Sequence, residues 1–297
     1  MGLFNRFKKS SANSKGVKLA NLGKYQEALE CFDKAVQSDP ERSEAWYNKA
    51  SALLNLEKYQ EALECFEKAI QLNPNDATTW FKKGITLGNL EQQKEALKCY
   101  NESLTLNHEN YKVWYNKGVT LEILGKSQEA LKCFQEASKL NPKDSKSWYN
   151  YGLILGNFER YQEALESYNN VLKIDVEFYS AWYNKGNILK DLEKNEEAIE
   201  CYDEVLRLHP EHVGARGNKG IAFNKLGMYE EALNCFNKVL KLDQADVMGW
   251  YNKGNALMKM GEDQEALKCF EKALKIDPDF QDAKKAKEEL LSKFTHF

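Results

Sequence analysis

The tryptophans of this chain are spaced by multiples of 34 residues, and this spacing restricts the possible folds more than any other feature. The six tryptophans are Trp46, Trp80, Trp114, Trp148, Trp182 and Trp250, with Arg216 in the one vacant position. The seven cysteines keep the same period at Cys31, Cys65, Cys99, Cys133, Cys201, Cys235 and Cys269, with Ser167 in the gap, and so do all five prolines. A fixed period of this length is typical of stacked repeats. We therefore expect a repeat array rather than the two globular domains that 297 residues would suggest.

Eight repeats fit between two short end segments. Residues 1–8 form an N-terminal tail, residues 9–280 form the array, and residues 281–297 form a final helix. The predicted repeats are 9–42, 43–76, 77–110, 111–144, 145–178, 179–212, 213–246 and 247–280. The first repeat lacks the tryptophan and is defined by its remaining periodic residues, such as Gly16 and Cys31.

Each repeat contains two helical patterns. Trp46, Ala50 and Leu53 fall on one face of a first helix, and the same spacing recurs in a second helix after a short break, at Ala62, Phe66 and Ala69. Glycine recurs in the first helix from the third repeat on, although glycine inside a helix costs about 1 kcal/mol relative to alanine. Its recurrence predicts that two helix backbones approach closely there.

The sequence resembles the tetratricopeptide repeat family, whose pattern places Trp, Gly, Ala, Phe and Pro at fixed offsets. Repeat 43–76 carries this pattern as Trp46, Ala50, Leu53, Ala62, Phe66, Ala69 and Pro74. The resemblance implies an all-α fold, a right-handed α-solenoid superhelix of about eight helix-turn-helix repeats with a C-terminal capping helix. It also implies that the first helices line a concave groove. The chain departs from the family in having lysine where leucine is expected before the glycine, at Lys83, Lys117, Lys185, Lys219 and Lys253.

Composition argues against several functional classes. The net charge of −3 lacks the basic excess of a nucleic-acid binder, and no run approaches the roughly 18–20 apolar residues that span a bilayer. The tail combines Leu3, Phe4 and Phe7 with basic residues. It is interpreted either as a turn of helix that covers the first repeat or as a weak interfacial membrane anchor.

No catalytic, cofactor or metal site is predicted. Equivalent cysteines of neighbouring repeats should lie on the order of 20 Å apart, because another helix separates them. Disulfides are then excluded, and the cysteines are interpreted as small, partly buried apolar residues in a reducing, cytoplasmic compartment. His209 and His212 flank Pro210 and Glu211 in a turn, which is too few ligands for a metal centre. We find no phosphate-binding loop, dinucleotide fingerprint or nucleophile motif, so the chain is not expected to be an enzyme.

The candidate binding surface consists of residues that recur without an obvious stacking role. An aromatic residue follows the tryptophan position at Tyr47, Phe81, Tyr115, Tyr149, Tyr183 and Tyr251. The next position holds Asn48, Asn116, Asn150, Asn184, Asn218 and Asn252, with Lys82 in the third repeat. One turn further along the helix, apolar residues in the middle repeats give way to Asn187 and Asn255. By resemblance, these residues line the groove, where an asparagine amide can pair with peptide main chain. Asparagine is also a common residue at this position in the family at large, and both interpretations stay open.

The predicted function is a scaffold that binds an extended peptide or partner segment in the groove. Lys112, Lys146 and Lys190 are expected to favour acidic segments. The alternatives are a self-assembling structural protein or the regulatory subunit of an enzyme complex. The partner is expected to be a protein, and a monomeric state is favoured. Repeat 213–246 lacks both Trp and Tyr, which indicates either sequence drift or a hinge.

Overall fold

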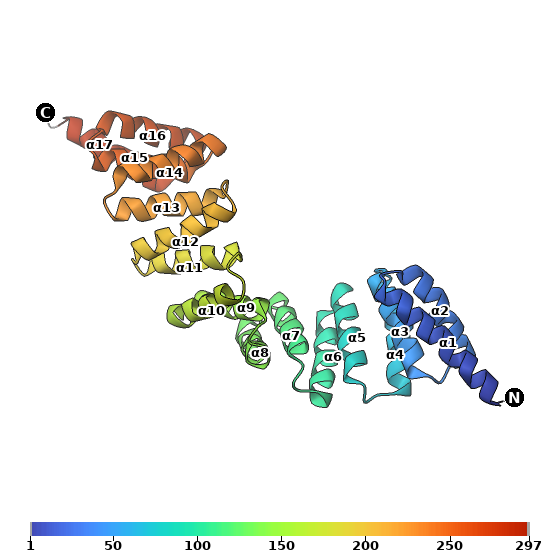
Figure 1. Cartoon of the computed structure of the whole chain (residues 1–297). Coiled ribbons are helices and arrows are strands. Elements are labelled where there is room, and N and C mark those ends of the chain that lie inside the picture. Colours follow the sequence, from blue (N-terminus) through green and yellow to red (C-terminus); the bar gives the residue numbers. More distant parts are fainter. Residues whose placement is uncertain (1, 296–297) are drawn as a thin grey trace. The chain divides into compact units, whose positions relative to one another are not determined.

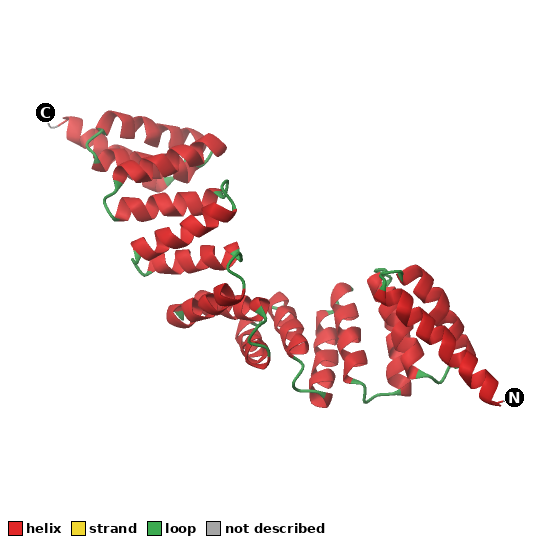
Figure 2. Ribbon diagram, in the orientation of Figure 1, coloured by secondary structure: helices red, strands yellow, loops and turns green. Residues whose placement is uncertain are grey.

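The computed structural model describes the backbone of residues 2–295 and the side chains of residues 12–293. The described residues form seventeen α-helices joined by short loops, with no strand among them (Figures 1 and 2). The predicted all-α solenoid of helix-turn-helix repeats is confirmed. The chain divides into two compact units, residues 1–147 and residues 148–297, which we call the N-terminal half and the C-terminal half.

The helices follow one another as pairs. The first helices of the pairs are α1 (Gly2–Asn21), α3 (Ser43–Asn55), α5 (Ala77–Asn89), α7 (Tyr111–Ile123), α9 (Ser145–Asn157), α11 (Tyr179–Asp191), α13 (Val213–Lys225) and α15 (Val247–Lys259). The second helices are α2 (Tyr25–Ser38), α4 (Tyr59–Leu72), α6 (Gln93–Leu106), α8 (Ser127–Leu140), α10 (Tyr161–Ile174), α12 (Asn195–Leu208), α14 (Tyr229–Leu242) and α16 (Asp263–Ile276). The last helix, α17, spans Gln281–Thr295.

First helices occupy the inner side of each half. Every second helix packs between two first helices, as α2 does between α1 and α3. In addition, successive first helices touch each other directly, at α1–α3, α3–α5 and α5–α7 in the N-terminal half and at α11–α13 and α13–α15 in the C-terminal half. Second helices make no comparable contact with one another in the described part of the chain. The side chains on this inner side therefore meet those of the neighbouring repeat.

An aromatic ring explains the glycine in the first helices. A Cβ added to Gly84 would lie 2.5 Å from the ring of Tyr100, and one added to Gly254 would lie 2.6 Å from the ring of Phe270. Both rings belong to the second helix of the same pair and are buried. The close approach predicted from the sequence is therefore made by a side-chain ring and not by a second backbone, and the expectation is corrected in this respect.

The tryptophans fasten each first helix to the turn that precedes it. The indole Nε1–H of Trp46 donates to the carbonyl of Pro40 at 2.8 Å, and the indoles of Trp80, Trp114, Trp182 and Trp250 make the same bond six residues back, at 2.8–3.0 Å. Arg216 preserves this bond in the repeat without tryptophan, because its guanidinium donates to the carbonyl of Pro210. The vacant tryptophan position therefore keeps its polar contact while losing the indole ring.

The unexpected lysines bridge neighbouring repeats. The Lys83 ammonium lies 5.9 Å from the centre of the Trp80 ring and 3.0 Å from the Glu67 carboxylate of the preceding second helix. Lys49 pairs in the same way with Trp46 and Asp33, at 5.7 Å and 2.8 Å. The lysine stem thus covers apolar surface while its charge meets a carboxylate sixteen residues earlier in the chain.

The two ends of the array differ from the repeats between them. Residues 2–8 of the predicted tail belong to the backbone of α1, and the tail side chains lie outside the described residues. At the other end, α17 packs on α16 and buries Ala283, Ala286 and Leu290, while its remaining described side chains are largely exposed. This is the amphipathic arrangement expected of a terminal cap.

Candidate functional site

The candidate site is the row of side chains on the inner side of the first helices, which we call the inner row. It comprises the predicted aromatic, asparagine and following positions, from Tyr47, Asn48 and Ser51 in α3 to Tyr251, Asn252 and Asn255 in α15. Its aromatic rings are half-buried, except for Phe81, which is 7% exposed.

Each aromatic ring of the inner row packs against a ring of the second helix in its own pair. The ring centres are 6.1 Å apart in Tyr47–Phe66, and 5.7–6.3 Å apart in Phe81–Tyr100, Tyr115–Phe134, Tyr149–Tyr168, Tyr183–Tyr202 and Tyr251–Phe270. These rings therefore have a structural role that the sequence did not reveal. Burial, together with the nearby Asp76 charge, also raises the pKa of Tyr47.

Asparagines of the inner row connect successive first helices. The Asn184 amide donates to the Tyr149 hydroxyl at 3.1 Å, and the Asn218 amide donates to the Asn187 side-chain oxygen at 2.8 Å. In each bond the donor lies one repeat after the acceptor. The Asn187 oxygen also accepts from the Tyr202 hydroxyl at 2.9 Å, so Asn187 is committed to contacts within the protein.

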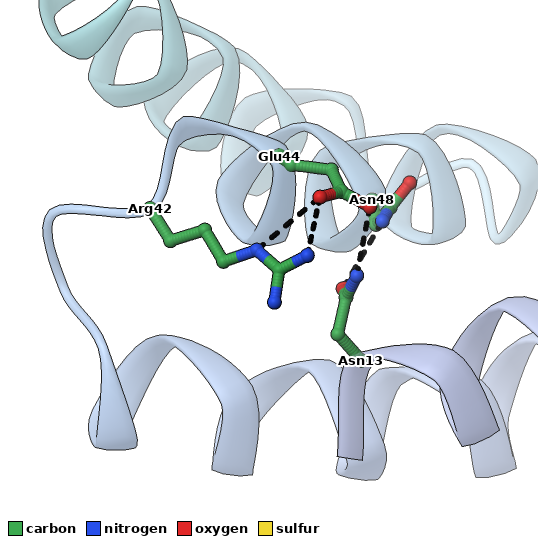
Figure 3. Close-up of polar contacts among 4 residues, drawn as sticks. All are labelled: Asn13, Arg42, Glu44 and Asn48. Carbon is green, nitrogen blue, oxygen red and sulfur yellow. Dashed lines mark hydrogen bonds and ion pairs between the residues drawn. The ribbon is translucent and has the colours of Figure 1, made fainter. Parts of the chain in front are cut away.

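Asn48 makes the equivalent bond at the start of the array (Figure 3). Its amide donates at 3.0 Å to the side-chain oxygen of Asn13 in α1, which occupies the aromatic position of the first repeat. Asn13 in turn donates to Glu44 at 3.0 Å, and Glu44 accepts from the Arg42 guanidinium (Figure 3). Asn13 is 2% exposed, and this network anchors α1 to α3.

The other predicted residues behave differently. The Asn116 amide turns back to the Lys112 carbonyl of its own helix at 2.7 Å, and Asn150, Asn252 and Asn255 are half-buried. Lys112 and Lys146 are exposed, and the Lys112 ammonium lies 6.0 Å from the centre of the Tyr111 ring. Lys190 forms an ion pair with the neighbouring Asp191 at 3.3 Å. The inner row is therefore not a uniform ladder.

Sequence reasoning missed one set of residues that contact the inner row in the C-terminal half. Phe178, His212 and Phe280 all lie four residues before a tryptophan position. Their rings lie 4.9, 4.9 and 5.1 Å from those of Tyr149, Tyr183 and Tyr251, respectively. The 34-residue spacing of Phe178 and His212, and the 68 residues between His212 and Phe280, were the signal that could have revealed them.

The histidine turn is a packed structure. The His212 Nδ1 accepts the Ala215 amide at 3.0 Å and so caps α13, while the His209 ring lies 4.2 Å from that of Tyr179. A cavity of about 370 Å³ beside them is lined by Tyr179, Leu208, His209, Pro210, Glu211 and His212. Within the described residues, no cluster of three or more His, Cys, Asp or Glu side chains is arranged to hold a metal ion.

The cysteines lack the features of reactive thiols. All seven are free and buried. Burial raises the pKa of the Cys65, Cys99, Cys133 and Cys201 thiols to about 11, because an apolar surrounding disfavours the thiolate. They are therefore unsuited to nucleophilic chemistry near neutral pH. None of the described helices is long and apolar enough to cross a membrane.

These features define a repeat solenoid of the kind that serves as a protein-interaction scaffold. The tetratricopeptide repeat profile matches residues 43–76, 111–144, 179–212 and 247–280, and related profiles of the same repeat match residues 12–42, 65–98, 133–166 and 220–261. The chain belongs to the tetratricopeptide repeat family. A protein prenyltransferase alpha subunit repeat profile also matches residues 161–192.

Solved structures with the same fold cover different shares of the chain. The crystal structure of YrrB, described as a TPR protein with an unusual peptide-binding site, matches with a TM-score of 0.57 and 29% identity over 63% of this chain and 96% of that one. MamA from Desulfovibrio magneticus RS-1 matches with a TM-score of 0.55 and 22% identity over 57% of this chain and 96% of that one. The Cut9–Hcn1 assembly of the APC/C matches with a TM-score of 0.53 and 17% identity over 90% of this chain and 52% of that one.

Among curated proteins, an uncharacterized protein of Methanocaldococcus jannaschii is 47% identical over 38 residues. The match spans 13% of this chain and less than half, 44%, of that protein.

Proposed function

We propose that this protein is a scaffold that binds an extended segment of a partner protein along the inner row. The observation that carries the proposal is the row itself, a series of half-buried aromatic rings and asparagine amides at equivalent places on successive first helices. Ring packing and hydrogen bonds hold these side chains in place, as at Tyr149 and Asn184.

The chemistry of the row suits a main-chain ligand. An asparagine side chain offers two N–H donors and one acceptor oxygen, and the bond to the preceding repeat uses one donor. The remaining groups of Asn48 and Asn184 match the donors and acceptors of an extended peptide, whatever its sequence. Since neighbouring repeats already fix these side chains, little side-chain entropy is lost on binding. The exposed parts of the aromatic rings add apolar contact area.

YrrB supports the proposal, since its structure is described as having a peptide-binding site and it is 29% identical to this chain over most of its length. The proposal further assigns the chain to the cytoplasm as a monomer, with a protein and not nucleic acid as its partner. The net charge of −3 and the free thiols are consistent with this assignment.

Selection from a random twelve-residue peptide library displayed on phage, with the full chain as bait, tests the proposal. We expect peptides to be enriched, and we expect alanine at two or more adjacent inner-row asparagines, among Asn48, Asn116, Asn184, Asn218 and Asn252, to weaken binding of the synthetic peptides about three- to tenfold, the cost of one hydrogen bond. The matched controls are Asn101→Ala and Asn237→Ala, on exposed positions of second helices. Absence of enriched peptides, or equal losses in both sets of variants, would refute the proposal.

A further inference from the structure

A small cavity opens beside the inner row at the N-terminal end of the array. It has a volume of about 210 Å³ and lies among α1, α2, α3 and α5. Its walls are formed by Val17, Ala20, Asn21, Tyr25, Phe32, Tyr47, Asn48, Ser51, Ala52, Asn55 and Lys82. Two inner-row asparagine and tyrosine positions therefore meet a lysine from the next repeat in one hollow.

We infer that this cavity receives a carboxylate of the bound peptide, with Lys82 as its ion-pair partner. The inference rests on the proposed function and specifies a preference at one end of the row. Lys82 occupies the position that is asparagine in six other repeats, so it is the one residue that gives this row of amides a charge.

The environment of Lys82 lacks a counter-charge. Its side chain is half-buried, and burial together with the charge of Lys112 lowers its pKa. Neither Lys82 nor Lys112 forms an ion pair within the described part of the chain. A cation that is partly removed from water beside a second cation is unfavourable, and an incoming anion relieves both effects. Unfavourable charges of this kind are typical of binding sites.

The nearby acidic groups are engaged elsewhere. The Asp76 carboxylate, which influences Tyr47, accepts the Thr78 amide at 3.1 Å and the Thr79 hydroxyl, and so caps α5. Glu44 is held by Arg42 and Asn13. The positive charge at the Lys82 wall is therefore not neutralised by either carboxylate.

Hydrogen-bond donors complete the cavity. The Asn48 amide uses one N–H for Asn13, and the Asn55 amide uses one for the Ser51 carbonyl at 2.7 Å. Each amide retains a second N–H, and Tyr47 adds a hydroxyl at the same wall. A carboxylate has two oxygens and about four acceptor positions, which suits one ammonium and several neutral donors.

The experiment uses the peptides selected above and three variants of the full chain. Lys82→Asn removes the charge while installing the residue that the other repeats carry. Lys82→Arg keeps the charge, and Lys98→Asn removes an exposed lysine from the second helix α6 as the control. We expect an Asp or Glu at a fixed place in the selected peptides, and we expect its change to Asn or Gln to weaken binding at least tenfold to the wild type, to Lys82→Arg and to Lys98→Asn, but not to Lys82→Asn.

Two arms distinguish the sources of the carboxylate. Peptides with an amidated C-terminus retain only side-chain carboxylates, and peptides without Asp or Glu retain only the terminal one. Loss of Lys82-dependent binding in one arm identifies the other carboxylate as the ligand group. Peptides that bind tightly without a carboxylate requirement, or that discriminate Glu from Gln equally on wild type and Lys82→Asn, would overturn the inference while leaving the proposed function intact. Failure to select any peptide would overturn both.

Discussion

Two glycines of α13, three residues apart, have opposite surroundings. A Cβ on Gly220 would lie 2.7 Å from the Phe236 ring, whereas a Cβ on Gly217 would meet nothing within 4 Å. Gly220 therefore leaves room for the buried ring of the second helix. Gly217, at a position where most repeats have an aromatic residue, leaves an empty place on the inner row.

Alanine substitutions should separate these roles. We expect Gly217→Ala to raise the free energy of unfolding by about 1 kcal/mol, through better helix propensity without a clash. Gly220→Ala should lower it by about 1–3 kcal/mol, because the Phe236 ring must move. Urea unfolding followed by circular dichroism measures both values. Destabilisation by both substitutions would contradict the space seen at Gly217.

At the residue scale, the sequence predicted positions better than contacts. The recurrent glycine correctly indicated a close approach, but only the structure shows that a ring makes it. The partner of Lys83 could not be named because Glu67 lies on the second helix of the preceding repeat. The equivalent position holds a carboxylate in only some repeats, as at Asp33 and Asp203 but not at Asn101. A pattern that is incomplete along the chain gives a weak signal.

At the element scale, the turn inside each helix pair needs one residue with a left-handed backbone. This residue is glycine in four pairs, at Gly23, Gly125, Gly227 and Gly261, with φ of 72–82°. It is glutamate in the other four, at Glu57, Glu91, Glu159 and Glu193, with φ of 59–62°. A side chain disfavours this conformation by about 1–2 kcal/mol, so half of the turns are under strain.

Exchanging the two residue types tests this strain. We expect Glu91→Gly to change the free energy of unfolding little or to raise it by up to about 1 kcal/mol, since relief of strain exceeds the added freedom of the unfolded chain. Gly125→Ala should lower it by about 1 kcal/mol, because alanine is forced into the left-handed region. Thermal unfolding monitored by calorimetry gives both values. A stabilising Gly125→Ala would show that these turns relax to another conformation.

The periodic pattern located the first helices and the residues on their inner side, but the bonds among those residues were not predictable. The amide of Asn184 reaches Tyr149, whereas the amide of Asn116 turns back to its own helix. Both asparagines occupy the same place in the repeat, so the difference arises from neighbouring side chains and not from the period. The charged end of the row at Lys82 became visible only when the cavity brought it beside Asn48 and Tyr47.

At the scale of the whole molecule, buried ionisable groups make stability depend on alkaline pH. The thiols of Cys65, Cys99, Cys133 and Cys201 have a pKa of about 11 in the folded protein, compared with about 8.5 in an unfolded chain. Their raised pKa in the folded state means that they contribute full stability below about pH 8.5. This contribution is lost as the pH rises towards 11, because the unfolded chain releases these protons first.

We therefore expect the urea midpoint to fall progressively between about pH 8.5 and 11. A variant with alanine at these four cysteines should show a shallower decline over the same range, and buried tyrosines such as Tyr100, whose pKa is also raised, account for the remainder. Unfolding curves at fixed ionic strength measure this effect. Parallel declines for the wild type and the variant would show that the thiols are not coupled to folding.

The placement of the thiols also allows the repeats to be followed separately. In the tetratricopeptide array, seven repeats each hide one cysteine in the second helix, and Ser167 leaves the remaining repeat unmarked. An alkylating reagent reaches such a thiol only when the surrounding helices separate, so each site's rate of modification measures local opening at that position in the array. Mass spectrometry of the seven peptides would then map where the array loosens first, and where a bound partner holds it closed.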